Sequence, residues 1–387
     1  MSRPCHTIAA AALAALLLAL AAAPATADPA GLTLSVDAPL PWLDPLVLAW
    51  EEDGLRLQAL SVHGEIWGYE LRAGMMPVAW GPSPFENLLF GDGPGLPLVW
   101  LAADYDGFEI LPAMHYENFY AALPPRGGSD RYLIGRRYTA GSGRWQFGLI
   151  ETALLSGDFS PYYLIPYPFF PLSVCKVFLT ESRVGDPKDA NLLYQLDACY
   201  NGERGFGYAA LLIDELPITP AWNGPYRIGL QLGGGIERFL GRDDLALAGE
   251  YTAVSRYTFT YHEGYAAGDY WAGDGPLGHA LGPDADLLKA RLTRDFGTWL
   301  GWIELARERH GEGGFGDRWD PAAGQALEFL TGTVETTWML GAGCEIGLGG
   351  GFTAGLELAV GRVSNLNHRL GIDGWDGTLA LRLELVL

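Results

Sequence analysis

The 387-residue chain has little positive charge. Its 25 lysines and arginines are outnumbered by 46 aspartates and glutamates, which gives a formal net charge of −21. Such an excess of negative charge argues against nucleic acid as a partner and against docking onto anionic lipid through a basic patch.

Long apolar runs are absent beyond the N-terminus. An apolar stretch at 8–23 follows Arg3 and precedes an A-x-A pattern at 25–27, which is typical of a secretory signal peptide. We therefore expect a signal peptide at 1–27, with a membrane-anchoring helix as the alternative. Its removal takes Arg3 away and changes the formal charge from −21 to −22. No later run reaches about 18 apolar residues, so no transmembrane helix is expected.

Cysteines and catalytic motifs are also scarce. Cys5 falls in the signal peptide, which leaves Cys175, Cys199 and Cys344. An odd number leaves at least one thiol unpaired; Cys175 with Cys199 is the expected pair if one forms, and three small buried side chains are the alternative. The seven histidines show no metal-ligand spacing, and GxSxG, HExxH, P-loop and CxxC patterns are missing. We therefore expect no enzyme, no cofactor and no metal.

What the chain does have is glycine (53 residues), aromatic residues and long stretches that alternate between apolar and polar. Alternation at period two predicts β-strands, and short turns between such stretches predict hairpins. The hairpins expected on this basis cover 132–155, 191–214, 226–259, 287–309 and 334–360, and a last strand covers 377–387. Turns such as "GSG" and "NGER" are short enough to keep each pair adjacent.

These strands have about 9–12 residues, one apolar face and one face of Arg, Glu, Gln, Thr and Gly. A strand of about 9–11 residues spans a membrane, and its apolar face then contacts lipid while its polar face lines the interior. We predict an all-β protein: one closed antiparallel transmembrane outer-membrane β-barrel of about 16–18 strands, formed by residues 28–387 as a single domain. A secreted sandwich or propeller is the alternative.

Two regions interrupt the alternation, at 73–130 and 157–190. The second, "GDFSPYYLIPYPFFPLSVCKVFLTESRVGDPKDA", is rich in proline and too long for a hairpin turn. Because so apolar a segment is poorly placed in water, we expect it to fold into the lumen as a plug; a large surface loop is the other interpretation.

Four segments in a fixed order carry a resemblance to a known family. They are "RYLIGRRYTAGSGRWQFGLIETALLSG", "YLIPYPFFP" followed by "DANLLYQLDACY", "GFGYAALLIDEL", and "GPLGHALGPDADLLKARLTR", and they cover about residues 130–294. Together they resemble the Wzi family of outer-membrane capsule-assembly proteins. The family commonly has His where Arg136 or Arg137 stands here.

The resemblance implies an outer-membrane barrel of about 18 strands whose lumen is occluded by inward-folded segments. It also implies a surface lectin that holds exported polysaccharide at the cell surface. The partners would be extracellular polysaccharide and outer-membrane lipid, and we expect a monomer. A porin-like passive diffusion channel is the alternative function, and a scaffold that binds another envelope protein is a third.

Five charged residues at strand positions are candidates for a charge network in the lumen: Arg136, Arg137, Glu151, Asp197 and Asp214. Neighbouring residues on a strand point to opposite faces, so only one of the two arginines can face inward. Such a set either forms ion pairs that secure plug to wall or contacts sugar directly.

Candidates for polysaccharide binding lie in one glycine-rich loop: Tyr261, Tyr265, Asp269, Tyr270, Trp271 and Asp274. Sugar rings stack on aromatic planes, and carboxylates accept hydrogen bonds from hydroxyl groups. The other interpretations of this loop are an aromatic girdle at the membrane interface and ordinary loop packing.

Overall fold

A computed structural model of the chain describes residues 32–37, 46–51, 54–66, 69–91, 96–105, 114–157, 190–214, 224–261, 266–273, 275–317, 319–320, 326–349 and 352–386. Within these ranges the regular structure consists of β-strands and three-residue 3-10 helices. No helix among them is long and apolar enough to cross a membrane. The expected signal peptide and the expected plug at 157–190 fall almost wholly outside the described residues.

Seventeen strands form the main sheet: β1 (Leu32–Asp37), β2 (Leu46–Glu51), β3 (Gly54–Ile66), β4 (Tyr69–Met76), β5 (Leu96–Tyr105), β6 (Met114–Arg126), β7 (Ser129–Ser142), β8 (Trp145–Ser156), β9 (Ala190–Asn201), β10 (Gly205–Asp214), β11 (Ile228–Glu237), β12 (Leu245–Val254), β15 (Ala285–Asp295), β16 (Trp299–His310), β17 (Glu335–Gly349), β18 (Phe352–Ser364) and β19 (Asp373–Val386). A separate small pair joins β13 (Trp271–Ala272) to β14 (Gly275–Pro276).

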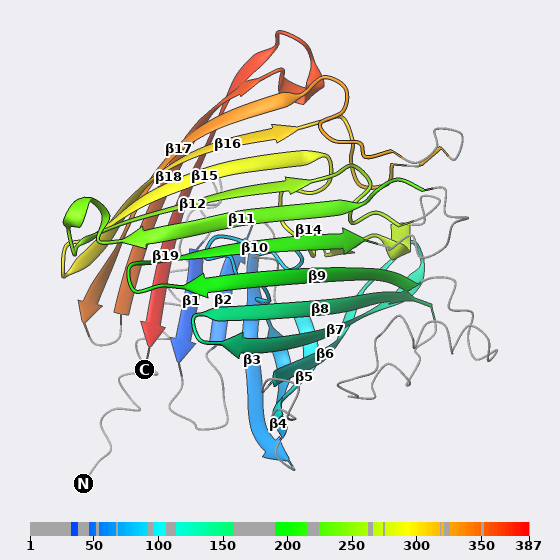
Figure 1. Cartoon of the computed structure of the whole chain (residues 1–387), viewed down its shortest axis with the longest axis horizontal. Helices are drawn as coiled ribbons and strands as arrows, with labels where there is room; N and C mark the ends of the chain where they lie inside the picture. The colour runs from blue at the N-terminus through cyan, green and yellow to red at the C-terminus, as the bar shows by residue number, and fades with distance from the viewer. Residues whose placement is uncertain are drawn as a thin grey trace.

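Successive strands of the main sheet pair antiparallel, as the sequence predicted. β1 pairs with β2 on one side and with β19 on the other, and the β1–β19 pair is parallel. The parallel pair follows from the number of strands: when an odd number of strands alternate in direction, the first and last run the same way. Figure 1 shows the sheet curving so that these two strands become neighbours.

The two ends of the strands differ in their connections. One end carries short turns such as 143–144, 202–204 and 296–298, and the longest described connections, 255–284 and 311–334, are at the other end. In Figure 1 the short turns between β8 and β12 lie at the left and the long connections at the right. We call these the turn end and the loop end.

The two faces of the sheet bury different side chains. On β8, Ile150 and Leu154 belong to the large hydrophobic core, while Ala153 and Leu155 belong to a smaller cluster. The large core also contains residues of the loop-end connections, such as Leu88 and Phe259. The connections therefore enter the space enclosed by the sheet and pack against its inner face.

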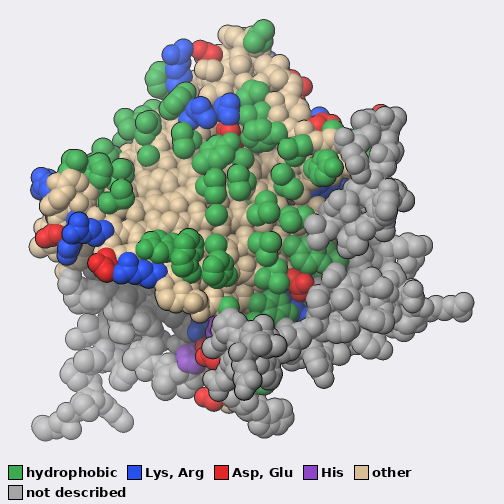
Figure 2. Space-filling view, in the orientation of Figure 1, with side chains coloured by type: hydrophobic (Ala, Val, Ile, Leu, Met, Phe, Trp, Pro, Cys, Tyr) green, Lys and Arg blue, Asp and Glu red, His purple; other side chains and the backbone are tan. Residues whose placement is uncertain are grey.

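The outer face is apolar and exposed. Ile303 and Leu305 on β16 are 54% and 51% exposed, and Leu340 on β17 is 58% exposed. Fully buried polar side chains, such as Gln231 and Thr252, lie on the inner face. Figure 2 shows hydrophobic side chains spread across this outer face. The arrangement is the reverse of a water-soluble protein, where exposed patches of large apolar side chains are small.

Strand boundaries agree with the sequence in most hairpins but not after β12. The alternation predicted a strand through Phe259, whereas β12 ends at Val254. Tyr257 and Phe259 adopt left-handed backbone conformations, with φ of 69° and 68°, and Phe259 is fully buried in the core. The strand ends because the chain turns inward there. Its last alternating residues therefore pack in the hydrophobic core inside the sheet and do not continue the strand.

Candidate functional site in the lumen

Two segments fold into the space enclosed by the sheet. One is 77–91, between β4 and β5; the other is the described part of 255–284, between β12 and β15. We call them the first and second inward segments. Their aromatic rings pack on each other and on the wall. The ring centroid of Trp80 lies 4.9 Å from that of Phe119 of β6, and the rings of Tyr270 and Phe259 stack with their centroids 5.9 Å apart. An apolar core therefore occupies the loop end of the lumen.

Polar contacts fix the second inward segment to the wall strands β7 and β10. The carboxylate of Asp214, at the end of β10, accepts a hydrogen bond from the backbone N–H of Phe259 at 2.7 Å. Arg131 of β7 donates to the carbonyl oxygens of Ala267 and Asp269 at 2.7 and 2.6 Å. These bonds satisfy backbone groups that are buried away from both water and secondary structure.

Asp269 links the segment to itself and to β6. Its carboxylate accepts a hydrogen bond from the backbone N–H of Tyr261 at 3.1 Å and lies 3.7 Å from the guanidinium of Arg126. Burial raises the pKa of Asp269 above its usual value, although the Tyr261 bond and Arg126 act in the opposite direction. The Arg126 guanidinium also lies over the ring of Trp271, at 5.2 Å.

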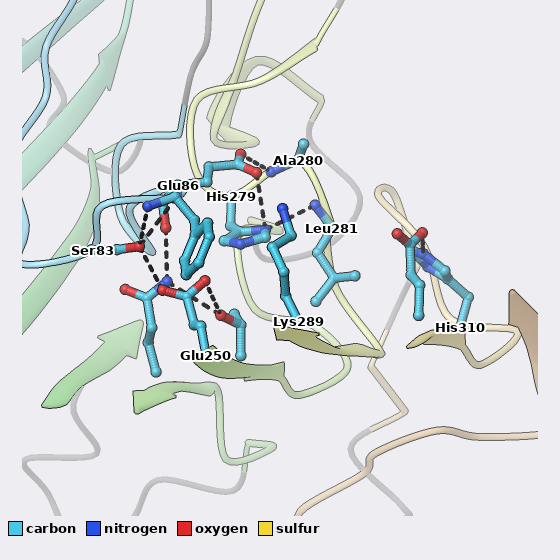
Figure 3. A network of polar contacts seen from close by, with 12 residues as sticks. Ser83, Glu86, Glu250, His279, Ala280, Leu281, Lys289 and His310 are labelled. Carbon is cyan, nitrogen blue, oxygen red and sulfur yellow. Dashed lines mark hydrogen bonds and ion pairs between the residues drawn. The ribbon is translucent and has the colours of Figure 1, made fainter. Parts of the chain in front are cut away.

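The first inward segment is held by Glu250 of β12 (Figure 3). Its carboxylate accepts a hydrogen bond from the hydroxyl group of Ser83 at 2.5 Å, which Figure 3 shows. It accepts a second from the hydroxyl group of Tyr208, also at 2.5 Å. Gln231 of β11 adds a bond to the carbonyl oxygen of Glu86 at 2.7 Å. The first segment therefore depends on the wall strands β10, β11 and β12.

Glu86 and His279 join the two inward segments. The Glu86 carboxylate accepts a hydrogen bond from the backbone N–H of Ala280 at 2.5 Å, and its second oxygen lies 3.6 Å from Nδ1 of His279. That Nδ1 accepts a hydrogen bond from the N–H of Leu281 at 3.2 Å, so it carries no proton. Burial, with a smaller effect of Lys289, lowers the pKa of His279 to about 3. The imidazole is uncharged at neutral pH.

Paired charges line the inner wall on the turn-end side of the core. Lys289 and Arg291 of β15 form ion pairs with Glu304 of β16. Nζ of Lys289 and Nη2 of Arg291 lie 3.7 and 2.7 Å from the carboxylate oxygens of Glu304. Both cations also lie over the ring of Phe85, at 5.4 and 5.2 Å. Their side chains are 20% and 32% exposed, so water reaches this part of the lumen.

The same kind of lining continues on the opposite strands. Arg137 of β7 lies 3.6 Å from Glu117 of β6, and Arg72 of β4 lies 2.8 Å from Glu70. The side chains of Arg72 and Glu70 are 40% and 45% exposed. The polar part of the lumen is therefore lined by ion pairs of both signs in contact with solvent.

Three of the five residues predicted for the lumen network lie on the inner face of the sheet. Asp214 and Asp197 share the inner face with Leu212 and Leu193, and Arg137 faces inward beside Glu117.

Arg136 and Glu151 were predicted in the lumen network but lie on the other face of the sheet. They are directly paired between β7 and β8 and lie on the face that carries Ile134 and Ala153, which form the smaller cluster on the other side of the wall. Adjacent residues on β7 point to opposite faces, and sequence alone could not tell which of the two arginines faces inward.

Three of the six residues predicted to bind polysaccharide lie inside the protein and not on an accessible surface. Tyr261, Asp269 and Tyr270 are buried and form the packing and anchoring contacts described above. They are not accessible to a polymer outside the protein, and the loop-packing interpretation fits them. Trp271 is partly exposed. Its ring lies under the guanidinium of Arg126 and makes an edge contact with the ring of Phe315. Tyr265 and Asp274 lie outside the described residues.

Five further charged residues of the lumen were not among the predicted site residues: Glu86, Glu250, Lys289, Arg291 and Glu304. The last three were visible as polar residues at every second position of two alternating strands, but their pairing depends on register. Glu86 had no signal, since it lies in an irregular segment. Cys199 and Cys344 are free thiols, and Cys175, the expected partner of Cys199, lies outside the described residues. Within the described ranges, no group of three potential ligands is placed to hold a metal ion.

No protein-family model matches the chain, and no curated protein matches it. Among solved structures, the chain is similar to the Pseudomonas aeruginosa protein OccD3 (OpdP), with a TM-score of 0.45 and 12% sequence identity over 88% of this chain and 81% of that one.

Proposed function

We propose that the chain is a closed transmembrane β-barrel of the outer membrane that acts as a restrictive, porin-like passive diffusion channel for small polar solutes. The observation that carries the proposal is the solvent-exposed lining of paired charges inside the sheet, of which Arg72 and Glu70 are the most exposed pair. A charged, water-reached interior behind an apolar exterior is the arrangement of a channel wall.

Membrane insertion is supported by the outer face. Large side chains such as Ile303, Leu340 and Leu358 are more than half exposed on adjacent strands. Burying a Leu or Ile side chain fully is worth about 1.5–3 kcal/mol, so a wall with many such residues is strongly stabilised by an apolar solvent. The pairing of β1 with β19 supports closure, because every described strand of the main sheet then has a neighbour on both sides.

Restriction is supported by the two inward segments. Their apolar core occupies the loop end of the lumen, so any path for solutes passes beside it and along the charges near Glu304 and Glu117. Apolar constrictions resist hydration and charged linings select among solutes, so we expect a small and selective flux.

Liposome swelling tests this proposal. Proteoliposomes that contain the refolded chain should swell in small sugars and amino acids and resist swelling in larger oligosaccharides. Equal rates with and without protein, in a preparation whose barrel is folded, would contradict the proposal.

A second candidate is the polysaccharide-binding role implied by the resemblance to the Wzi family. The observation that favours it is the extent of the apolar core, because a lumen filled in this way would leave the protein closed to solutes. Loss of cell-bound polysaccharide in a deletion strain, restored by the wild-type gene, would support it. Unchanged retention would count against it.

A further inference from the structure

A row of directly paired residues crosses the outer face of six adjacent strands near the loop end. The row consists of Tyr251, Leu288, Arg307, Trp338, Arg362 and Trp375. Residues directly opposite each other in antiparallel strands share a face of the sheet. Trp338 and Trp375 are 49% and 77% exposed, so this face is the outer one. We call this set the Arg–Trp row.

The row lies where the proposed membrane would end. Between Trp299 at the turn end of β16 and Arg307, the outward residues include Ile303 and Leu305. At about 3.3 Å per residue and a tilt of about 40°, this path rises about 20 Å, close to the apolar band of about 25 Å in such barrels. Tryptophans are enriched at both interfaces of a membrane. Long connections of outer-membrane barrels are extracellular, so this interface belongs to the outer leaflet.

Two arginines on this surface have carboxylate partners. Arg309, which lies one outward position beyond Arg307, binds Asp286 at 2.9 and 2.5 Å, and Asp286 also accepts a hydrogen bond from Tyr251 at 3.1 Å. Arg362 binds Asp373 at 2.9 Å.

Arg307 is different. It makes no ion pair with any residue of the described chain, and its Nε is buried without a hydrogen-bond partner. Its guanidinium lies 5.9 Å from the ring of Trp338. A guanidinium held on an aromatic ring at a membrane interface, with no counter-charge from the protein, has its fork of N–H donors left for an anion.

We propose that Arg307, assisted by Arg309 and Arg362, binds a phosphate group on the headgroup of an outer-leaflet lipid. Along a strand Arg309 is about 7 Å from Arg307, and Arg362 is two strands or about 10 Å away. These spacings suit a phosphorylated glycolipid headgroup, and the flanking tryptophans pack on its apolar part. Figure 2 shows basic side chains interrupting the hydrophobic surface in its upper part. The proposal rests on the membrane placement above and holds for a channel or a closed barrel.

Native mass spectrometry of the full refolded chain in detergent tests the proposal, with diphosphorylated lipid A as the probe. Wild type should retain one equivalent, and dephosphorylated lipid A with the same acyl chains should bind at least about tenfold more weakly, as expected for charged hydrogen bonds. Arg307→Ala should lose binding by a similar factor and Arg307→Lys by less. Arg242→Ala, at the turn end, is the matched control and should bind as wild type.

Equal retention of the two lipids by wild type would overturn the proposal. This comparison uses wild type alone, so it is decisive even if a variant fails to fold. Equal binding by folded Arg307→Ala would also overturn it, as would full displacement by millimolar inorganic phosphate, which would identify a soluble anion as the ligand. A barrel that binds the lipid but conducts no ions would contradict the channel proposal and leave this one standing.

Discussion

The carboxylate of Asp214 accepts a hydrogen bond from the backbone N–H of Phe259 at 2.7 Å. This bond joins the end of the wall strand β10 to the point where the chain turns into the lumen. Phe259 is fully buried and stacks on Tyr270 within the apolar core. The bond is one of several that anchor the second inward segment, and a single substitution at Asp214 removes it.

Asp214→Ala removes the acceptor and leaves the Phe259 N–H buried without its partner. We expect a looser second segment and, in planar bilayers, more frequent or larger openings than in wild type. Asp214→Asn keeps a side-chain oxygen that accepts the same bond and should remain close to wild type. Identical current records for both variants would show that this bond does not hold the segment.

Arg131→Met removes two charge-assisted hydrogen bonds to the carbonyl oxygens of Ala267 and Asp269. Such bonds contribute about 1.5–3 kcal/mol each, so we expect the free energy of unfolding to fall by about 3–6 kcal/mol. Denaturant titration of the refolded barrel measures this change. Arg242→Ala, in an exposed turn, should change it by less than about 0.5 kcal/mol. A loss no larger than in that control would contradict the anchoring role.

His279 gives a pH dependence with a definite sign. Its pKa is lowered to about 3 in the folded protein, from 6.5 in the unfolded chain. The unfolded state therefore binds a proton that the folded state does not, so this contribution to stability is complete above pH 6.5 and is lost as the pH falls toward 3. At pH 5 the loss is about 2 kcal/mol.

His279→Gln should remove that component. Unfolding free energies at pH 7.5 and pH 5 should differ less in this variant than in wild type. His115→Gln, at a half-exposed histidine beside Asp104, is the control and should keep the wild-type difference. If His279→Gln keeps it too, the buried imidazole is not the group responsible.

Glu304 balances two cations in the lumen, Lys289 and Arg291. Glu304→Gln leaves both without their carboxylate in a part of the lumen that water reaches. We expect the reversal potential in a potassium chloride gradient to shift toward chloride. Glu203→Gln, in an exposed turn where the carboxylate pairs with Arg144, should leave it unchanged. A shift toward potassium would contradict the assignment of this lining.

The wall of the protein was predictable because alternation acts locally. The expected strand at 352–360 corresponds to β18 and the last strand to β19, whose Leu379 is 55% exposed as its apolar face requires. The main sheet of the described residues has 17 strands, which alternation predicts one strand at a time.

The lumen was harder to predict because it depends on contacts far apart in sequence. Glu86 meets Ala280, and Ser83 meets Glu250, across more than 160 positions. Tyr261 and Tyr270 look the same in sequence whether they face a ligand or a core. No local pattern distinguishes these cases, because the wall residues that anchor the segment of these tyrosines, such as Arg131 and Asp214, lie far away in the sequence.

Single-channel conductance of the refolded, full-length chain in a planar bilayer tests the central claim most directly. We expect small, stepwise and reproducible openings in symmetric potassium chloride, which become larger or more frequent in Asp214→Ala. An inserted and folded barrel that stays silent in both proteins would contradict the channel and leave the polysaccharide-binding role as the better account.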